Sequence, residues 1–423
     1  MLLTKVPRGT RDILPAEAEK WRRIEEKARE LCRLYRYGEI RTPIFEHTEL
    51  FSRSVGEDTD IVSKEMYTFE DRGKRRLTLR PENTASVVRA YLEHNLHAAP
   101  QPVKLYYIGP MFRYDRPQAG RYRQFHQFGV EAFGSQSPAL DAEIIHLADQ
   151  LYRQLGLKDV ALEINSVGCR QCRPLYREKL KDFFQGKLSG LCLECRQRHG
   201  TNTLRILDCK TEKCRRHFQD MPTLKANLCP GCSAHFESLK AGLDNLGLSF
   251  HVNPRLVRGL DYYTKTVFEF ISPRLGAQSS LGGGGRYDDL VEVCGGPSTP
   301  GSGFAVGLER ILLALEEEGV GREEEALEVY AAYIDVNALS RVDLLLKEMR
   351  LKNISCERDF LGRSLKAQLK QAGRAGARLT ILLGGEELDQ GKAIIKEMSS
   401  GEQETVPLAN VIEAVLKNLG REV

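Results

Sequence analysis

One stretch of the chain, residues 121–131, mixes aromatic, amide and charged side chains in a way that could bind a flat polar ligand. On a strand, alternate side chains share a face. Five side chains would then point one way: Arg123, Phe125, Gln127, Gly129 and Glu131. A buried charge is costly without a partner, so this face is unusual for a hydrophobic core. The pattern predicts a pocket that stacks a ring and holds polar groups, and the alternative is an edge strand with a solvated face.

Three arginines could hold phosphate or carboxylate groups near such a pocket. Arg113 lies on the predicted partner strand, and Arg258 begins a polar cluster ahead of another strand. Arg310 lies in the first turn of a predicted helix, where it is expected to face a glycine run at 282–285. A guanidinium can bind such anions through two parallel hydrogen bonds. Since no convincing catalytic nucleophile accompanies them, this set is typical of phosphoryl or nucleotidyl chemistry on ATP.

A glycine run at 282–285 is expected to form a loop. A second glycine-rich stretch lies at 295–307, and residues 303–310 are expected to run from the end of a strand into a helix. Four consecutive glycines could bring the main chain close to a ligand, or could form a tight turn. A dinucleotide-binding pattern that begins at Gly301 and Gly303 is a poor match, because its third glycine is misplaced. The sequence also lacks the glycine-and-lysine pattern of a phosphate-binding loop.

Hydrophobic periodicity predicts the elements that position these residues. Ahead of the cysteine-rich stretch, we expect helices at residues 16–37 and 138–155 and strands at 103–115 and 121–133. A strand–turn–helix unit is expected at 77–93. A strand at 266–271 and a helix at 308–317 follow that stretch. The polar segment 116–120 would form a flexible loop between the two central strands.

A second domain is predicted after the acidic, glycine-bearing run at 316–325. Strand and helix patterns alternate beyond it: strands at 329–334 and 379–383, helices at 339–351, 363–373 and 407–419. This alternation is typical of a small α/β domain with a partly parallel sheet.

Composition excludes several classes of protein. The 423 residues carry a net charge of +4, 41% are hydrophobic, and no stretch is long and apolar enough to cross a membrane. The first residues lack the apolar run of a secretory signal, so we expect a cytoplasmic protein. Residues 166–250 hold 15 basic against 8 acidic side chains, and residues 341–378 hold 10 against 4. Two basic regions would suit a long polyanion, although solvated helix faces give the same pattern.

Eight of the 11 cysteines form four pairs within the insertion-like segment 166–250. The pairs are Cys169 with Cys172, Cys192 with Cys195, Cys209 with Cys214, and Cys229 with Cys232. The first two pairs are 19 residues apart, which fits the spacing of a zinc ribbon. Two structural zinc sites with four thiolates each are one interpretation, and metal-free thiols are the other. Cys32, Cys294 and Cys356 are expected to be isolated buried thiols.

Five blocks, in order along the chain, resemble the histidyl-tRNA synthetases, which are class II aminoacyl-tRNA synthetases. They are residues 41–46 around Pro43, 112–131, 256–263, 283–288 and 303–310. Residues 362–366 and 384–387 resemble the anticodon-binding domain of this family. The resemblance is to the bacterial type and covers essentially the whole chain.

The resemblance implies an α+β fold. A class II catalytic core, an antiparallel sheet flanked by helices, would span residues 1–323 and be interrupted by a cysteine-rich insertion domain at 166–250. A linker at 324–328 would precede a C-terminal α/β anticodon-binding domain at 329–423. The block around Pro43 would lie at the interface of a homodimer.

The implied activity is that of a histidine–tRNA ligase, which uses ATP with Mg²⁺ to make histidyl-adenylate and then transfers histidine to the 3′ end of its tRNA. Arg113 would hold the α-phosphate, Arg310 the γ-phosphate, and Arg258 the histidine carboxylate and the transition-state charge. Phe125 would stack on adenine. The implied histidine-binding set is Glu82, Asn83, Thr84, Arg113, Gln127, Glu131, Arg258, Tyr262 and Tyr263. Within it, Glu131 and Tyr263 would read the imidazole, since a carboxylate accepts from a ring N–H and a phenol can donate or accept.

Two regions would contact tRNA if the resemblance holds. The loop with Arg116, Gln118 and Arg121 would meet the acceptor end. A basic helix face with Arg363, Lys366 and Lys370 could approach the anticodon stem, or could be a solvated face.

Two other functions would explain parts of this sequence. A synthetase-like regulatory subunit of ATP phosphoribosyltransferase would normally lack the domain at 329–423. A zinc-containing RNA-binding protein would leave the five ordered blocks unexplained. Two positions depart from the family's common pattern, since Asn83 and Asp289 stand where glycine is frequent; asparagine tolerates unusual backbone angles, whereas the effect of Asp289 on its loop is open.

Overall fold

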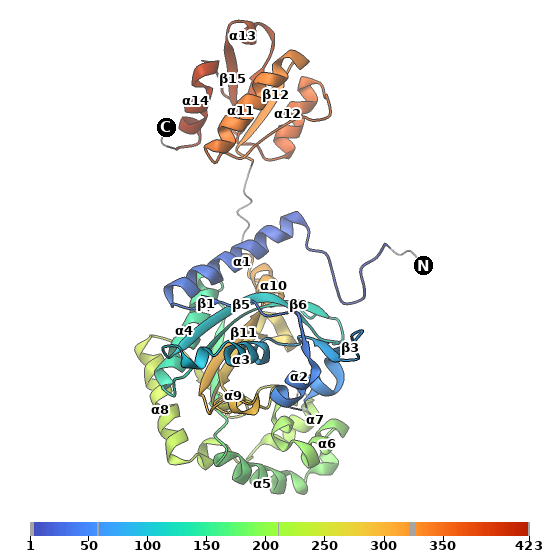
Figure 1. The fold of residues 1–423 in the computed structure, drawn as a ribbon, viewed down its shortest axis with the longest axis vertical. Helices are drawn as coiled ribbons and strands as arrows, with labels where there is room; N and C mark the ends of the chain where they lie inside the picture. Colours follow the sequence, from blue (N-terminus) through green and yellow to red (C-terminus); the bar gives the residue numbers. More distant parts are fainter. Residues whose placement is uncertain (1–3, 57–58, 210, 321–326, 422–423) are drawn as a thin grey trace. The chain divides into compact units, whose positions relative to one another are not determined.

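The computed structural model describes residues 4–56, 59–209, 211–320 and 327–421. These residues form two compact units, divided after Val320 (Figure 1). Of the predicted linker at 324–328, residues 324–326 lie outside the described residues.

The first unit is built on an eight-stranded sheet with the order β1-β5-β6-β11-β10-β9-β7-β8. Its strands are β1 (Gly38–Glu39), β5 (Val103–Phe112), β6 (Gln124–Phe133), β11 (Gly301–Gly307), β10 (Ser280–Arg286), β9 (Thr264–Ile271), β7 (Ala161–Ser166) and β8 (His251–Val252). The pairings from β5 to β7 are antiparallel, and only the two-residue edge strands β1 and β8 pair in parallel. The expected antiparallel core sheet is confirmed.

Helices α1 (Pro15–Leu34), α4 (Pro138–Leu155) and α10 (Leu308–Glu317) cover one face of this sheet (Figure 1). Trp21 of α1 and Leu151 of α4 pack in one buried cluster with Phe128 and Val130 of β6. The helix starts follow the sequence: Ser137 caps α4 by accepting a hydrogen bond from the Ala139 N–H, and prolines occupy the first turns of α1 and α4. One face of the sheet is thus committed to the core.

A small three-stranded sheet and three further helices lie at the other face. The strands are β2 (Phe45–His47), β4 (Arg76–Leu79) and β3 (Tyr67–Glu70), in that order across the sheet. Helices α2 (Thr48–Val55), α3 (Thr84–Glu93) and α9 (Leu290–Val293) contact one another here, and a π-helical turn, η1 (Ile61–Glu65), follows α2. The predicted strand–turn–helix unit at 77–93 is β4 followed by α3.

The cysteine-rich segment between β7 and β8 is helical. It contains α5 (Cys172–Gln185), α6 (Leu193–Thr201), the 3-10 helix η4 (Thr203–Asp208), α7 (Glu212–Arg215) and α8 (Pro230–Asn245), drawn in greens and yellow-green in Figure 1. Tyr176, Leu180 and Phe184 of α5 are buried in a cluster shared with the site-bearing part of the core. The segment therefore packs onto the core and does not stand apart from it.

The second unit contains a five-stranded sheet with the order β13-β12-β14-β15-β16. The strands are β12 (Val329–Tyr333), β13 (Cys356–Arg358), β14 (Leu379–Leu383), β15 (Lys392–Glu397) and β16 (Gln403–Pro407), and the helices are α11 (Leu339–Leu351), α12 (Leu365–Arg374), α13 (Gly385–Asp389) and α14 (Val411–Asn418). Strand β12 pairs in parallel with β13 and β14, whereas β15 and β16 add antiparallel pairs. The partly parallel α/β sheet is confirmed.

The expectation of a loop at the four glycines is wrong, because residues 282–285 lie inside β10. They pair with β9 on one side and β11 on the other. A Cβ atom at Gly284 would lie 2.0 Å from the carbonyl oxygen of Gly303, so the strands could not approach with a side chain there. Glycine serves close strand contact here and not a turn.

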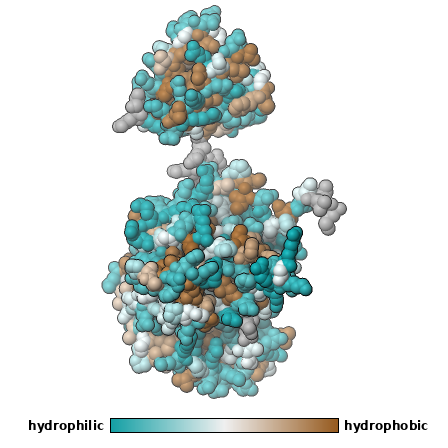
Figure 2. Space-filling view, viewed as in Figure 1, coloured by the Kyte–Doolittle hydropathy of each residue, from teal (hydrophilic) through white to brown (hydrophobic). Residues whose placement is uncertain are grey.

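No described helix is long and apolar enough to cross a membrane. The face drawn in Figure 2 is mostly hydrophilic, with hydrophobic residues scattered over it.

Candidate active site

A cavity of about 260 Å³ opens over the face of β6, β10 and β11 that the core helices leave free. Its polar and aromatic lining includes Glu82, Thr84, Tyr107, Arg113, Arg121, Phe125, Gln127, Glu131, Arg258, Tyr262, Tyr263, Tyr287 and Arg310. Segments from across the first 310 residues therefore meet at one place.

The alternation predicted for residues 121–131 is confirmed within β6. Phe125, Gln127 and Glu131 line the cavity, whereas Phe128 and Val130 are buried in the core on the opposite face. Arg123 does not join the first group, because it precedes the strand and its guanidinium lies 3.8 Å from the ring centroid of Tyr114.

Glu131 is a buried carboxylate surrounded by hydroxyl groups. Its Oε1 accepts hydrogen bonds from Thr84 Oγ1 at 2.8 Å and from Tyr107 Oη at 3.4 Å, and its Oε2 accepts one from Tyr287 Oη. Burial raises the pKa of Glu131 to about 8, although these hydrogen bonds act in the opposite direction. The hydroxyls fix the carboxyl group in place at the base of the cavity.

Sequence reasoning missed Tyr107 and did not single out Tyr287. Tyr107 pairs across β5 and β6 with Gly129, where a Cβ would lie 2.4 Å from the tyrosine oxygen. Gly129, among the ligand-facing residues of β6, thus indicated that a large side chain of the neighbouring strand lies over it.

Glu82 is buried at the start of α3. Its carboxylate accepts hydrogen bonds from the main-chain N–H groups of Thr84 at 2.8 Å and Ala85 at 2.9 Å. Burial raises the pKa of Glu82, and the two N–H groups oppose that shift. The helix start therefore holds this acidic group at the cavity wall.

Arg113 extends from the end of β5 into the cavity. Its Nε donates to the carbonyl oxygen of Pro81 at 2.8 Å, and its guanidinium carbon lies 5.3 Å from the ring centroid of Phe125. Burial lowers the pKa of Arg113, and no carboxylate is in salt-bridge distance of it among the described residues. A positive charge held in this way attracts an anion.

Arg258 and Arg310 are both linked to Ser280, at the start of β10. Arg258 Nη1 pairs with Glu269 Oε1 at 2.7 Å, and that same oxygen accepts from Ser280 Oγ at 2.6 Å. Arg310 Nε donates to the carbonyl oxygen of Ser280 at 2.5 Å. Glu269, on β9, was not identified from the sequence, since a single glutamate within an apolar strand gives no sign of its partner.

Three buried polar atoms at the cavity find no hydrogen-bond partner among the described residues: Gln127 Oε1, Arg258 Nε and Arg310 Nη2. Buried polar atoms in folded proteins are rarely left unpaired, and an acceptor and two cationic donors facing one cavity favour a zwitterionic or anionic ligand.

Asn83 is not among the residues that line the cavity, and its assignment to the histidine-binding set stays a prediction. Its side chain is fully buried behind the wall, where Oδ1 accepts from Thr42 Oγ1 at 2.7 Å and from Arg80 at 3.3 Å. Its φ of −116° also shows that the position needs no unusual backbone. Tyr262 and Tyr263 do line the cavity.

The predicted tRNA loop lies beside the cavity. Arg121 contributes to the lining, and Arg116 and Gln118 are exposed. Gln118 and Arg121 bridge the loop through main-chain hydrogen bonds of 3.2 and 2.9 Å.

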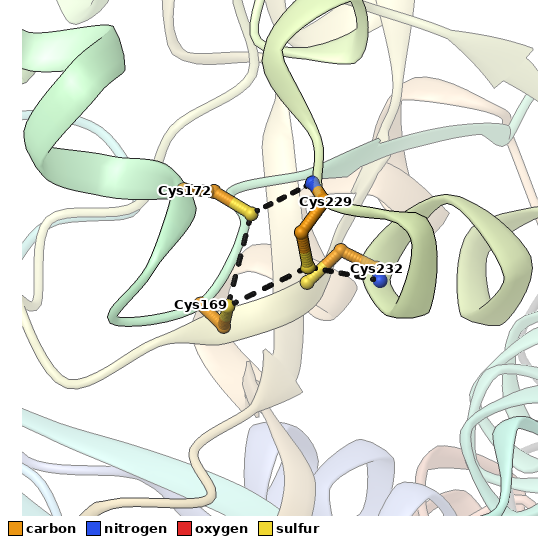
Figure 3. Close-up of side chains that lie close together, drawn as sticks. All are labelled: Cys169, Cys172, Cys229 and Cys232. Carbon is orange, nitrogen blue, oxygen red and sulfur yellow. Dashed lines mark hydrogen bonds between the residues drawn. The ribbon is translucent and has the colours of Figure 1, made fainter.

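The paired cysteines gather into two groups of four, nested along the chain. We call Cys169, Cys172, Cys229 and Cys232 the neck cluster, and Cys192, Cys195, Cys209 and Cys214 the tip cluster. In each cluster the four sulfur atoms all lie within 4.8 Å of one another (the neck cluster is drawn in Figure 3). The zinc-ribbon spacing grouped the first pair with the second, and the structure corrects this grouping. All eleven cysteines are free thiols; Cys32 is buried, whereas Cys294 and Cys356 are only half-buried.

Main-chain N–H groups point at the sulfur atoms of both clusters. The Cys229 N–H donates to Cys172 Sγ and the Cys192 N–H to Cys214 Sγ, each at 3.1 Å. The Cys232 N–H lowers the pKa of Cys229 to about 7. Such donors stabilise thiolate, which is the form of cysteine that binds metal.

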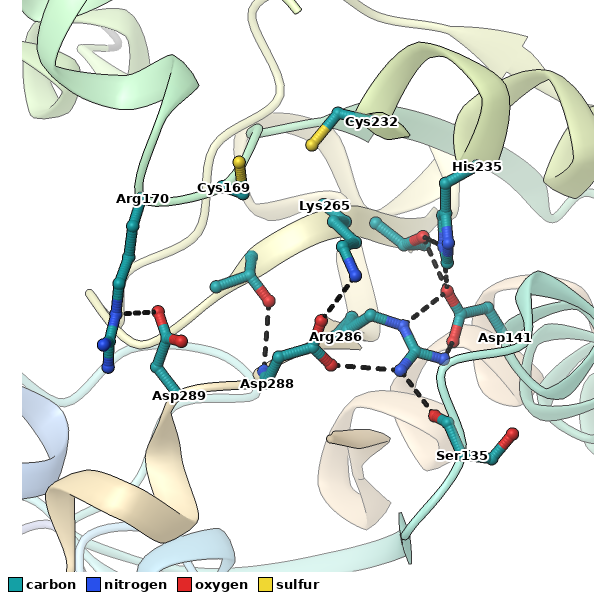
Figure 4. Close-up of polar contacts among 12 residues, drawn as sticks. Ser135, Asp141, Cys169, Arg170, Cys232, His235, Lys265, Arg286, Asp288 and Asp289 are labelled. Atoms are coloured by element: carbon teal, nitrogen blue, oxygen red, sulfur yellow. Dashed lines mark hydrogen bonds and ion pairs between the residues drawn. The ribbon is translucent and has the colours of Figure 1, made fainter. Parts of the chain in front are cut away.

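A buried ion pair ties the end of β10 to α4 (Figure 4). Arg286 Nη2 lies 2.6 Å from Asp141 Oδ1, and both side chains are fully buried. Asp141 also accepts from Thr266 at 2.7 Å and contacts His235 of α8 at 2.9 Å. Nearby, Asp289 pairs with Arg170 at 2.8 Å, so the residue that departs from the family's glycine links its loop to the neck of the insertion.

Comparison with known protein families gives two matches. Residues 9–311 match the family model described as "Histidyl-tRNA synthetase", and residues 328–418 match the model described as "Anticodon binding domain". The family match includes every residue named above in the cavity.

Individual relatives agree with these matches. The chain is 58% identical to a histidine–tRNA ligase of Desulforamulus reducens over 97% of this chain and 98% of that one. It is 57% identical to a histidine–tRNA ligase of Pelotomaculum thermopropionicum over 97% of each chain. The crystal structure of apo S. aureus histidyl-tRNA synthetase superposes with a TM-score of 0.82 at 43% identity, covering 97% of this chain and 99% of that one.

Proposed function

Because this chain belongs to the histidyl-tRNA synthetase family, we propose that the cavity over β6, β10 and β11 is where it joins histidine to tRNA. The enzyme is a ligase with a two-step reaction. A histidine carboxylate oxygen first attacks the α-phosphorus of ATP, the bond to the bridging oxygen breaks, and pyrophosphate leaves. A hydroxyl of the terminal adenosine of tRNA then attacks the histidyl carbonyl carbon, and AMP leaves.

In this proposal Glu131 and Tyr263 read the imidazole ring. The hydroxyls of Thr84, Tyr107 and Tyr287 hold the Glu131 carboxyl group, which can accept a ring N–H. A site built to hydrogen-bond a ring rejects apolar side chains of similar size, because its buried polar groups would be left unpaired. This buried, fixed carboxyl group supports the choice of histidine.

The α-amino group of histidine would lie between Glu82, Thr84 and Gln127. Glu82 supplies negative charge, and the unpaired Gln127 Oε1 supplies an acceptor. Asn83 is left out of this set, because its side chain is engaged behind the cavity wall.

ATP, with its Mg²⁺, would bind along the arginines. Adenine would stack on Phe125, Arg113 would hold the α-phosphate, and Arg310 would hold the γ-phosphate end. The spread of these positive groups over one cavity, with aromatic Phe125 beside Arg113, supports this orientation.

Arg258 would contact both the histidine carboxylate and the α-phosphate. Its Nη1 is held by Glu269 while its Nε is unpaired, so the guanidinium is fixed and still has a free donor. A positioned cation of this kind lowers the free energy of a transition state in which negative charge gathers at phosphorus. This single observation carries the proposed catalytic assignment.

The test is histidine-dependent exchange of pyrophosphate into ATP, with all twenty amino acids tried in turn. We expect exchange with histidine alone, and a loss of about 100-fold or more in Arg258→Ala. Arg274→Ala is the matched control, because Arg274 pairs with Asp159 on the surface outside the cavity. Full exchange in Arg258→Ala would contradict the assignment.

We also propose that tRNA contacts both units. Arg116, Gln118 and Arg121 would meet the acceptor end beside the cavity, and exposed Lys366 and Lys370 of α12, with the nearby Arg363, would approach the anticodon stem. Replacing Lys366 and Lys370 by alanine should raise the KM for tRNA and reduce its salt dependence, while leaving pyrophosphate exchange unchanged.

The enzyme would act as a homodimer. Ile44, Phe45 and Phe69 form an exposed apolar group next to Pro43, with exposed fractions of 45%, 51% and 43%. Three large apolar side chains exposed side by side favour contact with a protein partner. Light scattering should give twice 47.7 kDa, and Phe45→Glu should shift the mass toward one chain.

Two zinc ions would fill the neck and tip clusters as structural metals. A tetrahedral ion with Zn–S bonds of about 2.3 Å separates its sulfur ligands by about 3.8 Å. In the structure, the Sγ atoms of Cys169 and Cys172 are 3.7 Å apart, and those of Cys192 and Cys209 are 4.0 Å apart. Elemental analysis should find two zinc ions per chain.

Reduced thiols and a tRNA substrate both favour a cytoplasmic location.

The alternative function, a regulatory subunit of ATP phosphoribosyltransferase, is not favoured, since the relatives are ligases and the anticodon-binding match is present. Such a subunit would give no exchange with histidine.

A further inference from the structure

The loop that carries Arg258, Tyr262 and Tyr263 is held in place by the cysteine-rich insertion. Arg205 Nη1 donates to the carbonyl oxygen of Gly259 at 2.8 Å. Asn202 Nδ2 lies 3.1 Å from both carboxylate oxygens of Asp261. Each contact falls within three residues of Arg258, so the insertion fixes the loop on both sides of Leu260.

The same arginine reaches a second segment beside the cavity. Arg205 Nη2 pairs with Asp60 Oδ2 at 3.0 Å, and Arg198 Nη2 approaches that oxygen at 3.3 Å. Asp60 directly precedes η1, whose Ile61 lines the cavity. One guanidinium thus bridges two parts of the active-site wall.

Asn202 and Arg205 lie between the two halves of the tip cluster. Cys192 and Cys195 precede them at the start of α6, and Cys209 and Cys214 follow η4. Both side chains belong to buried residues, with exposed fractions of 6% for Asn202 and 9% for Arg205. Closing the tip cluster therefore fixes both ends of the segment from which the two side chains reach the loop.

The other substrate-facing arginines are held differently. Arg113 is fixed by Pro81 and Arg310 by Ser280, and both contacts come from outside the insertion. A change in the insertion would therefore displace Arg258, which contacts the α-phosphate as well as histidine, and leave the other proposed ATP contacts in place.

We propose that a metal ion in the tip cluster positions Arg258 through Asn202 and Arg205, so that histidine activation depends on an ion that touches no substrate. Asn202 and Arg205 are positioning residues in this arrangement. The inference rests on the proposed function of the cavity and on the proposed metal in the cysteine clusters. It goes beyond both, because it assigns the insertion a part in amino-acid activation.

The first test is Asn202→Ala, assayed by histidine-dependent pyrophosphate exchange with KM measured for histidine and for ATP separately. We expect kcat to fall by about 10- to 100-fold, since small displacements of positioned groups have effects of this size. The histidine KM should rise more than the ATP KM, because ATP keeps its proposed contacts with Phe125, Arg113 and Arg310. A merely structural role would reduce the active fraction, which lowers kcat and leaves both KM values alone.

The matched control is Asn227→Ala. Asn227 lies in the same insertion and donates to the Thr223 carbonyl oxygen at 2.8 Å, with no contact to the loop. It should behave as wild type. Zinc content should remain two ions per chain in both variants, which separates lost positioning from lost metal.

A polarity swap tests the contact itself. In Asn202→Asp the new carboxylate faces the carboxylate of Asp261, and the two repel each other. Histidine activation should therefore be as impaired as in Asn202→Ala. Adding Asp261→Asn restores a donor and an acceptor in reversed order, and should recover most of the histidine KM. Absence of recovery, together with an Asn202→Ala variant that has normal kinetics, would overturn the inference.

The metal is tested with Cys195→Ser and Cys209→Ser combined. This variant should carry one zinc ion and show the same pattern as Asn202→Ala, a histidine KM that rises more than the ATP KM. Normal histidine kinetics with one ion lost would refute the coupling. Wild-type protein without exchange would instead refute the proposed function, and wild-type protein active without zinc would refute the proposed metal.

Discussion

Glu131 combines two properties that single residues of a protein core seldom share: it is fully buried, and it must meet a polar ligand. Its position in the ligand-facing row of β6 could be predicted from alternation alone, together with Phe125 and Gln127. Its hydroxyl partners could not, because Tyr107 and Tyr287 come from segments whose register with β6 depends on the folded sheet.

The raised pKa of Glu131 predicts how stability depends on pH. At about 8 in the folded protein, against an ordinary 4.5, the carboxyl group keeps a proton that the unfolded chain releases. Its stabilising effect is therefore complete below about pH 4.5 and lost as the pH rises through 8. Relative to Glu131→Gln, wild-type protein should lose a few kcal/mol of unfolding free energy between pH 5 and pH 9.

Urea unfolding followed by tryptophan fluorescence measures this difference. Trp21 is the chain's single tryptophan and is buried in the core of the first unit, so the signal reports that unit. A difference between the two proteins that does not change with pH would show that Glu131 is ionised throughout.

Gly283 offers a second test at the level of single residues, because its position limits the space for Arg258. A Cβ there would lie 2.4 Å from the Phe268 carbonyl oxygen and 2.8 Å from Arg258 Nη1. Both the pairing of β10 with β9 and the Arg258 guanidinium therefore have to shift, and Gly283→Ala should reduce histidine activation by about 100-fold. In Gly186→Ala the new methyl group meets open space, and pyrophosphate exchange should be unchanged. Equal activity of the two variants would argue against a precise position for Arg258.

Among the helices and strands, β10 was the hardest to predict from the sequence. Four glycines indicated a loop, since glycine is rare inside strands, and only close packing between β9 and β11 explains them. The cysteine groups show a similar limit. Pair spacing indicated metal ligands, whereas the nesting of the pairs follows from the way α5 and α8 meet at the neck.

The ion pair that ties β10 to α4 should contribute strongly to stability. Asp141→Asn would leave the fully buried Arg286 with only the partly exposed Asp288 as an anionic partner. Removing one partner of a buried pair costs about 3–5 kcal/mol, and we expect a loss of unfolding free energy of that size in urea.

Asp149→Asn provides the comparison on the same helix. Asp149 pairs with Arg153, which is exposed, at 2.6 Å, and such a pair contributes about 1 kcal/mol or less. If both substitutions cost the same, the Asp141 pair is not the anchor that its burial indicates.

At the scale of the whole molecule, the chain divides into a unit that ends at Val320 and one that follows it. The acidic, glycine-bearing run marked this division in the sequence, and the alternating pattern beyond it predicted the second fold. The antiparallel strands β15 and β16 were missed, because they are short and charged and lack a clear apolar period.

Every cavity residue precedes Ile311, so the first unit should activate histidine without the second. A chain that ends at Val320 is expected to keep histidine-dependent pyrophosphate exchange and to lose most transfer of histidine to tRNA, since the proposed anticodon contacts are removed. Exchange and transfer should be measured on the same preparation. Loss of exchange in a folded fragment would mean that the second unit contributes to the cavity.

A crystal structure with histidine and a non-hydrolysable ATP analogue would show directly whether this cavity holds both substrates together. In the arrangement that we expect, the imidazole lies within hydrogen-bond distance of Glu131 and Tyr263, the carboxylate at Arg258, adenine on Phe125, and the phosphates at Arg113 and Arg310. Histidine bound with its ring away from Glu131, or ATP bound away from Phe125, would contradict it.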